Sequence, residues 1–172
     1  LLIGAPIKED GRTIGVVALQ MPTKPMNKIV QRREGLGETG ETYLVGRHDG
    51  ETAFRSDLQT MGEGEYVIGY EISTPYIEKA LDGESLIEVF TDSSGKLVLV
   101  EADPLKIHGL DWAMITKINL EEAIAPTVEG QDQDFYADYI EQYGYYDLFL
   151  IHPDGEVFYT VTREADYQTN MI

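Results

Sequence analysis

The stretch GLGETGETYLVGRHDGETAFRSD, residues 35–57, decides the fold of this chain. Residues 41–46 and 51–57 have the composition of short strands, and His48-Asp49-Gly50 between them has the composition of a tight turn. Gly35 and Gly37 are expected to end a preceding helix. The stretch holds no phosphate-binding loop, nucleophile elbow or metal-ligand pair. It therefore predicts a hairpin that begins a sheet rather than a catalytic motif.

Strand and helix patterns continue from this hairpin in both directions. Before it, residues 1–20 hold two apolar runs around the turn KEDGR, which predict two strands. Residues 23–34 predict a helix with Thr23 as its N-cap. After the hairpin, a polar, glycine-rich loop at residues 58–71 leads to a helix capped by Ser73. The chain thus alternates β-hairpins with short helices.

The second half of the chain repeats this alternation. Three strands are predicted by SLIEVFTD, KLVLVEADPL and GLDWAMITKI, and the alternation of Trp112 with Met114 assigns Trp112 to the core. Asn119 and Glu122 have the spacing of a capping box, so a helix is expected from Asn119 to about residue 143, interrupted at Pro126. A last hairpin is predicted by YYDLFLI and EVFYTVTR.

An internal repeat organises these elements. LLIGAPIKEDGRTIGVVALQ matches LVLVEADPLKIHGLDWAMIT in pattern, with Pro6 at the place of Pro104. Likewise Asp154-Gly155 stands at the place of Asp49-Gly50, so the spacing is near one hundred residues. One copy of the unit is complete within residues 23–126, and a second is present only as its two ends. Because orphan strands expose apolar edges, we expect residues 1–22 and about 144–172 to form a second small sheet or to pair between molecules.

Composition and charge exclude several classes of function. The 172 residues include 31 acidic and 13 basic ones, for a net charge of −18, which disfavours binding to nucleic acid or to anionic lipid. The absence of cysteine excludes disulfides, thiolate metal sites and cysteine nucleophiles. No apolar run is long enough to span a membrane. An anionic ligand would therefore need a local cationic spot against the overall charge.

Several segments together resemble double Cache sensor domains. They are REGLGETGETYLVG, the RSD at residues 55–57, GLDWAMITKINLEEAIAP and YGYYDLFLIHPDGEVFYTVTREADYQTN. The resemblance covers nearly the whole chain. It implies an α+β fold of PAS-like modules, each a roughly five-stranded antiparallel sheet with flanking helices, joined by a long helix. It is specific for the family and says little about the ligand.

The resemblance also implies a domain order. Residues 23–126 match a complete membrane-proximal module with its leading helix, whereas residues 1–22 and 127–172 match the ends of a membrane-distal module. This order is permuted relative to a single double Cache domain. A tandem array and an incomplete segment of a longer chain both explain it.

The function implied is that of the extracytoplasmic sensor domain of a membrane-anchored receptor in bacterial signal transduction and chemotaxis. Such a domain would bind a small polar metabolite, such as an amino acid, carboxylate or amine, and would pass a conformational change to the cell interior. Its partners would be the small molecule and a second copy of the chain in a homodimer, with membrane contact only through segments outside this sequence. The alternative is a ligand-free spacer or dimer contact of such a receptor.

Candidate ligand-binding residues in the complete module follow the second strand. Arg55 is expected to clamp a carboxylate by a bidentate contact, with an ion pair to Asp57 or a glutamate as the alternative. Tyr66 and Tyr70 are candidates for a lid, with packing over the sheet as the alternative. Asp103 is a candidate partner for a ligand amine, with a turn cap before proline as the alternative. The ligand-binding set in this module is Arg55, Asp57, Tyr66, Tyr70 and Asp103.

The partial module adds a second set of candidates: Tyr146, Asp147, Tyr159 and Asp166. Asp147 interrupts an apolar strand, and a buried carboxylate requires a partner, which is either a ligand or the end of the preceding helix. The sequence offers no catalytic residues, no cofactor motif and no metal-ligand spacing. We therefore expect that the chain is not an enzyme. An enzyme that uses a pair of carboxylates is the remaining alternative.

Overall fold

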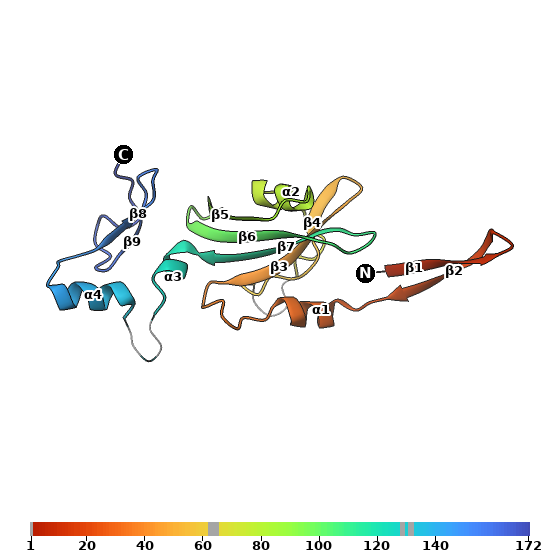
Figure 1. Ribbon diagram of the computed structural model, residues 1–172, viewed down its shortest axis with the longest axis horizontal. Coiled ribbons are helices and arrows are strands. Elements are labelled where there is room, and N and C mark those ends of the chain that lie inside the picture. Colours follow the sequence, from red (N-terminus) through yellow and green to blue (C-terminus); the bar gives the residue numbers. More distant parts are fainter. Residues whose placement is uncertain (1, 62–65, 128–129, 131–132) are drawn as a thin grey trace.

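The computed structural model describes residues 2–61, 66–127, 130 and 133–172. These residues form three separate sheets, which follow one another along the long axis of the molecule (Figure 1). Leu1, part of the predicted loop 58–71 and part of the predicted helical segment 119–143 lie outside the described residues.

The central sheet has five antiparallel strands in the order β4-β3-β7-β6-β5. Their bounds are β3 Glu41–His48, β4 Glu51–Phe54, β5 Leu86–Thr91, β6 Leu97–Leu105 and β7 Asp111–Asn119. The hairpin β3–β4 joins the hairpin β6–β7 through the pairing of β3 with β7. The predicted α+β, PAS-like sheet with flanking helices is thereby confirmed for this part of the chain.

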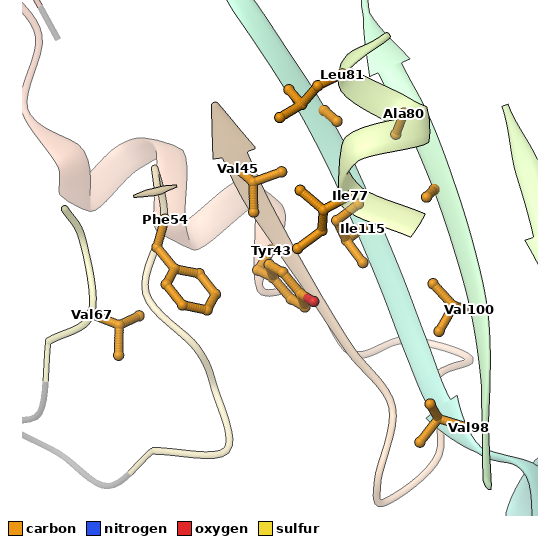
Figure 2. Close-up of a cluster of buried hydrophobic side chains, with 12 residues drawn as sticks. Tyr43, Val45, Phe54, Val67, Ile77, Ala80, Leu81, Val98, Val100 and Ile115 are labelled. Atoms are coloured by element: carbon orange, nitrogen blue, oxygen red, sulfur yellow. The ribbon is translucent and has the colours of Figure 1, made fainter. Parts of the chain in front are cut away.

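Helix α2 (Pro75–Leu81) covers one face of the central sheet. Its inner side presents Ile77, Ala80 and Leu81 to the strands, and Figure 2 shows these side chains against Tyr43, Val45 and Ile115. The complete cluster of buried apolar residues is Tyr43, Val45, Phe54, Val67, Ile77, Ala80, Leu81, Val98, Val100, Ala102, Ala113 and Ile115. This face of the sheet is therefore closed by packed side chains.

The N-cap of α2 is Thr74, whose Oγ1 accepts a hydrogen bond from the Ile77 N–H at 3.4 Å. The prediction of Ser73 as cap was one residue too early, because Pro75 takes the first helical position and leaves the cap to its neighbour.

Helix α1 (Thr23–Val30) lies on the opposite side of the central sheet from α2 (Figure 1). Pro22 takes its N-cap position without a side-chain bond, so Thr23 is the first helical residue rather than the predicted cap. The helix ends four residues before the predicted limit at residue 34.

Two short helices, α3 (Leu120–Ile124) and α4 (Phe135–Tyr143), replace the long helix expected after Asn119. The capping box is not formed. The Asn119 N–H donates instead to Thr39 Oγ1 at 3.1 Å. Glu122 accepts hydrogen bonds from the N–H groups of Glu38 and Thr39. Asn119 and Glu122, the two residues of the predicted capping box, therefore form hydrogen bonds with the loop before β3 instead of with each other.

The outer strands form two separate hairpins. One pairs β1 (Leu2–Glu9) with β2 (Arg12–Gln20), and the other pairs β8 (Phe149–Ile151) with β9 (Val157–Thr160). They lie at opposite ends of the molecule in Figure 1, so the second small sheet expected from residues 1–22 and 144–172 is not formed within one chain. Apolar side chains of β1–β2 stay exposed, at 44–64% for Ile3, Ile7, Ile14, Val16, Val17 and Leu19.

Candidate functional site

A cavity of about 490 Å³ lies between α1, the adjacent ends of β3 and β7, and the segment after β4. We call it the α1 pocket. It combines basic, apolar and glycine residues: Thr23, Met26, Arg47, His48, Arg55, Ile68, Gly109, Leu110, Asp111 and Trp112. The opposite face of the sheet is filled by the α2 core. Arg55 lines this pocket, on the face that the core leaves open.

Trp112 lines the α1 pocket, and its indole ring lies against Gly46 on the neighbouring strand. They lie opposite each other on β3 and β7, one residue beyond the pair Val45 and Ala113. Since side chains alternate along a strand and Val45 and Ala113 face the α2 core, Trp112 faces the α1 side. The assignment of Trp112 to the core was wrong, because β7 is apolar on both faces and alternation alone does not say which face is packed.

The side chain of Arg55 also lies against Gly46. Its Nη2 donates a hydrogen bond to the Gly46 carbonyl at 2.9 Å. Its Nε is buried and has no hydrogen-bond partner among the described residues. Within the described ranges Arg55 also forms no ion pair, so the alternative of a pair with Asp57 or a glutamate is not realised. A guanidinium carries five N–H donors, and this one keeps donors for another partner.

The neighbouring guanidinium of Arg47 is already neutralised. Arg47 contacts Glu78 at 2.7 Å, Asp82 at 3.1 Å and Asp111 at 3.5 Å. The hydrogen bond to Glu78, and then that to Asp82, raise the pKa of Arg47 above its ordinary value. Arg55 is therefore the arginine of this pocket whose charge is not matched by a carboxylate. Thr23 brings the N-terminal end of α1 to the same space, and helix N-termini carry partial positive charge.

Asp57 holds α1 in place. Its carboxylate accepts hydrogen bonds from Asn27 Nδ2 at 2.6 Å and from the Val67 N–H at 3.2 Å. Its backbone is bound as well, because Gln31 Nε2 donates to its carbonyl at 2.9 Å. The carboxylate of Asp57 is nearly buried and does not line the α1 pocket.

The other candidates of the complete module do not gather at this pocket. Tyr66 and Tyr70 are 70% and 66% exposed, so neither covers the sheet and neither lines the pocket. Asp103 lies inside β6, opposite Met114, rather than at a turn before Pro104. Of the five residues expected from the sequence, Arg55 alone lines the α1 pocket.

Asp147 closes the end of the C-terminal hairpin. It accepts hydrogen bonds from the N–H groups of Leu148, Val161 and Thr162 at 2.7, 3.0 and 3.2 Å, and from Thr162 Oγ1 at 2.6 Å. Burial alone would raise the pKa of Asp147, but these hydrogen bonds outweigh it and lower the pKa. Neither the ligand role nor a bond to the preceding helix end is needed to satisfy this carboxylate.

Tyr146 and Asp166 are surface residues. Tyr146 is 76% exposed, and its hydroxyl donates to Glu164 at 2.5 Å. The carbonyl of Asp166 accepts the hydrogen bond of Thr169 Oγ1 at 2.6 Å within a turn, and its side chain is exposed. These two residues are not brought together with Tyr159.

Tyr159 lines a second cavity, of about 610 Å³, between α3 and the C-terminal hairpin. Its hydroxyl donates to both carboxylate oxygens of Asp134, at 2.8 and 2.7 Å, and burial followed by this contact raises its pKa. In the same cavity Glu121 accepts from Arg163 and, at 2.6 Å, from the Tyr167 hydroxyl. The polar groups here satisfy one another and tie the hairpin to α3, a cluster that no local sequence signal indicated.

Within the described ranges, no cluster of three or more His, Asp or Glu side chains has the arrangement of a metal site. None of the described helices has the length and hydrophobicity that crossing a membrane requires.

No protein-family model matches the sequence, and no curated protein matches it. Solved structures similar to the chain are ligand-binding domains of chemoreceptors. One is that of CtaA from Pseudomonas fluorescens in complex with L-leucine, with 16% identity, a TM-score of 0.46 and coverage of 72% of this chain and 48% of that one.

Two further structures are of the same kind. The CtaA domain in complex with L-alanine has 19% identity, a TM-score of 0.45 and coverage of 72% and 49%. The domain of PctB from Pseudomonas aeruginosa PAO1 in complex with L-Gln has 18% identity, a TM-score of 0.46 and coverage of 83% and 52%. The chain thus spans about half the length of the structures that it resembles.

Proposed function

We propose that the chain is a ligand-sensing domain whose central module binds a small carboxylate-bearing metabolite in the α1 pocket. The observation that carries the proposal is the guanidinium of Arg55, which lies in a cavity of about 490 Å³ without a carboxylate partner among the described residues. In a chain of net charge −18, an unpaired cation of this kind supplies the local positive charge that an anionic ligand needs.

The shape of the pocket indicates the rest of the ligand. A carboxylate at Arg55 would leave the remainder of the molecule beside Met26, Ile68, Leu110 and Trp112, which supply apolar contact. Asp111 lies at the edge of the same pocket and offers an acceptor for an amine. These groups fit a small amino acid with an apolar side chain, and amino acids are the ligands of the similar chemoreceptor domains.

A path for the signal follows from the same contacts. Arg55 is two residues from Asp57, whose carboxylate and carbonyl bind Asn27 and Gln31 on α1. A ligand that binds one position of Arg55 better than another would therefore shift the equilibrium between two positions of α1. The size of this shift is set by the difference between the ligand's affinities for the two states. In a receptor anchored in the membrane, outside the cytoplasm, such a shift of α1 would be the output of the domain.

The test uses Trp112 as a probe, since it is the single tryptophan of the chain and it lines the α1 pocket. Purified chain is titrated with L-leucine, L-alanine, L-glutamine and acetate while Trp112 fluorescence and the melting temperature are followed. We expect saturable fluorescence changes and a raised melting temperature for at least one amino acid. Arg55→Gln should weaken that binding by ten-fold or more, whereas Arg12→Gln, an exposed arginine of the β1–β2 hairpin, should leave it unchanged.

The packed core under α2 favours a second function, that of a ligand-free spacer. A spacer would show no saturable change of Trp112 fluorescence with any of these compounds, and its melting temperature would not depend on their concentration. Equal responses of Arg55→Gln and Arg12→Gln would also exclude the α1 pocket as the binding site.

A further inference from the structure

The β1–β2 hairpin presents a strand edge and two apolar faces that nothing in the described chain covers. Ile3, Val17 and Leu19 are 50%, 53% and 63% exposed on one face, and Ile14 and Val16 are 59% and 64% exposed. An open, apolar strand edge is a template for pairing with another strand. The internal repeat identifies which strand that would be.

The C-terminal hairpin repeats the edge of the central sheet in its hydrogen bonds. In the central sheet, the Phe54 N–H on β4 donates to Tyr70 O, and Phe54 O accepts from the Gly69 N–H. In the C-terminal hairpin, the Val157 N–H on β9 donates to Thr169 O, and Val157 O accepts from the Gln168 N–H. The outer edges of β4 and β9 are thus covered in the same manner by the chain that follows.

The inner edges of the two hairpins differ. In the central sheet, β7 pairs with the side of β3 that faces away from β4. Among the described residues, β8 pairs with β9 alone, so its other side has no strand beside it. The counterpart of β7 in the repeat is β2, because Pro6 opposite Val16 repeats Pro104 opposite Ala113. In the second copy of the repeat, β8 therefore corresponds to β3 and β2 corresponds to β7.

Charge favours the same contact. Residues 1–33 hold six basic and two acidic residues, whereas residues 134–172 hold one basic and eight acidic ones. The two hairpins lie at opposite ends of the long axis (Figure 1), so β2 cannot reach β8 of its own chain. Complementary ends on an elongated molecule produce head-to-tail association.

We propose that β2 of one copy pairs with β8 of a second copy, antiparallel and in the register of β3 and β7. In that register Leu44 lies opposite Met114. Phe149 takes the place of Leu44, because each lies five residues before its Asp-Gly turn, and Val17 takes the place of Met114, because each follows the residue opposite the proline. Phe149 of one copy therefore lies opposite Val17 of the other. The contact gives the open backbone edges of β2 and β8 hydrogen-bond partners and brings the ends of the second Cache-like module together. Because it is not self-complementary, it extends from dimers to longer chains of molecules. It is independent of the ligand proposed for the α1 pocket.

Cysteine cross-linking tests this pairing without background, since the chain has no cysteine. Val17→Cys chain is mixed with Phe149→Cys chain at low ionic strength, oxidised and resolved by mass. Opposed residues of antiparallel strands are about 4.5–5.5 Å apart at Cα, within the range of a disulfide. We expect mixed dimers to predominate over either homodimer. The matched control is Ile3→Cys, which is 50% exposed against 53% for Val17 but lies on β1, away from the paired edge; it should give several-fold less mixed dimer.

Sedimentation of the unmodified chain provides the second measurement. The average mass should rise with protein concentration beyond that of a dimer, and should fall when salt is raised from about 0.1 M to about 1 M, because screening shortens the Debye length from ~10 Å to ~3 Å. Predominance of Val17→Cys homodimers, equal yields from Ile3→Cys and Val17→Cys, or a monomer at all concentrations would each overturn the proposal.

Discussion

Gly46 on β3 lies directly opposite Trp112 on β7, and the missing side chain of the glycine is what lets the indole and the guanidinium of Arg55 rest on the sheet. A Cβ built on Gly46 would lie 2.4 Å from Trp112 Cδ1 and 2.6 Å from Trp112 Nε1, both too close for real contacts, and a tight 3.0 Å from Arg55 Nε. The backbone of Gly46 itself is ordinary strand. Its importance comes from this close approach of two side chains, not from a special dihedral angle.

Gly46→Ala should therefore displace Trp112 and Arg55 together. We expect a destabilisation of about 1–3 kcal/mol, typical of overpacking, and a shift in Trp112 fluorescence. Urea unfolding followed by that fluorescence measures both. Gly15→Ala is the matched control, because it is also a strand glycine but the nearest atom to its added Cβ is Ile7 Cδ1 at an ordinary 3.7 Å. Equal effects of the two substitutions would contradict the packing argument.

Asp57 and Asn27 provide a graded test of how α1 is held. Asp57→Ala leaves the buried N–H of Val67 without its acceptor and frees Asn27, so it should cost about 1–3 kcal/mol of unfolding free energy. Asn27→Ala removes only the contact to α1 and should cost about 0.5–1.5 kcal/mol. Chemical denaturation measures both values. An Asn27→Ala effect larger than that of Asp57→Ala would show that the carboxylate does not organise the Val67 segment.

The strands of the central sheet could be predicted because their signals are local. Apolar runs such as residues 41–46 end at Asp49-Gly50, where Asp49 and Gly50 both adopt positive φ, as a tight hairpin turn requires. Helix ends were less predictable. Asn119 and Glu122 carry the spacing of a capping box, yet Thr39, eighty residues away, supplies the competing partner. A local rule fails where a tertiary contact offers the same groups a better-placed partner.

The lining of the candidate site was predictable in part. Arg55 could be found because it follows a strand in an acidic chain and therefore stands out as a cation. Its neighbours Gly46 and Trp112 could not, since their proximity depends on the pairing of β3 with β7 across more than sixty residues. The bond from Asn27 to the carboxylate of Asp57 could not be predicted either, because thirty residues separate the two in the sequence.

Two adjacent glutamates of α3 have different tasks, and each serves as the control for the other. Glu122 accepts hydrogen bonds from the Glu38 and Thr39 N–H groups and from Thr39 Oγ1, whereas Glu121 accepts from Arg163 and Tyr167. Glu122→Ala should lower the unfolding free energy reported by Trp112 by about 1–3 kcal/mol. Glu121→Ala should leave that value nearly unchanged and should increase hydrogen exchange in residues 163–167. Similar effects of both changes on Trp112 unfolding would refute this division.

Asp147 makes the C-terminal hairpin sensitive to acid. Its folded-state pKa lies below the ordinary 3.8, so the folded hairpin binds the proton less readily than the unfolded chain does. The stabilisation is therefore complete above pH 3.8 and is lost as the pH falls through the folded-state value. Hydrogen exchange at the amides of Val161 and Thr162, both of which donate to this carboxylate, reports the change.

Asp147→Asn should remove the acid dependence and should weaken protection of the two amides already at neutral pH, because a neutral amide oxygen accepts hydrogen bonds more weakly than a carboxylate. Asp166→Asn is the matched control in the same segment, since its exposed side chain accepts no hydrogen bond from the described residues and only its carbonyl is engaged. It should reproduce the unmodified chain at every pH. Loss of protection with Asp166→Asn as large as with Asp147→Asn would assign the acid sensitivity to the net charge of the hairpin, because only a specific contact distinguishes the two carboxylates.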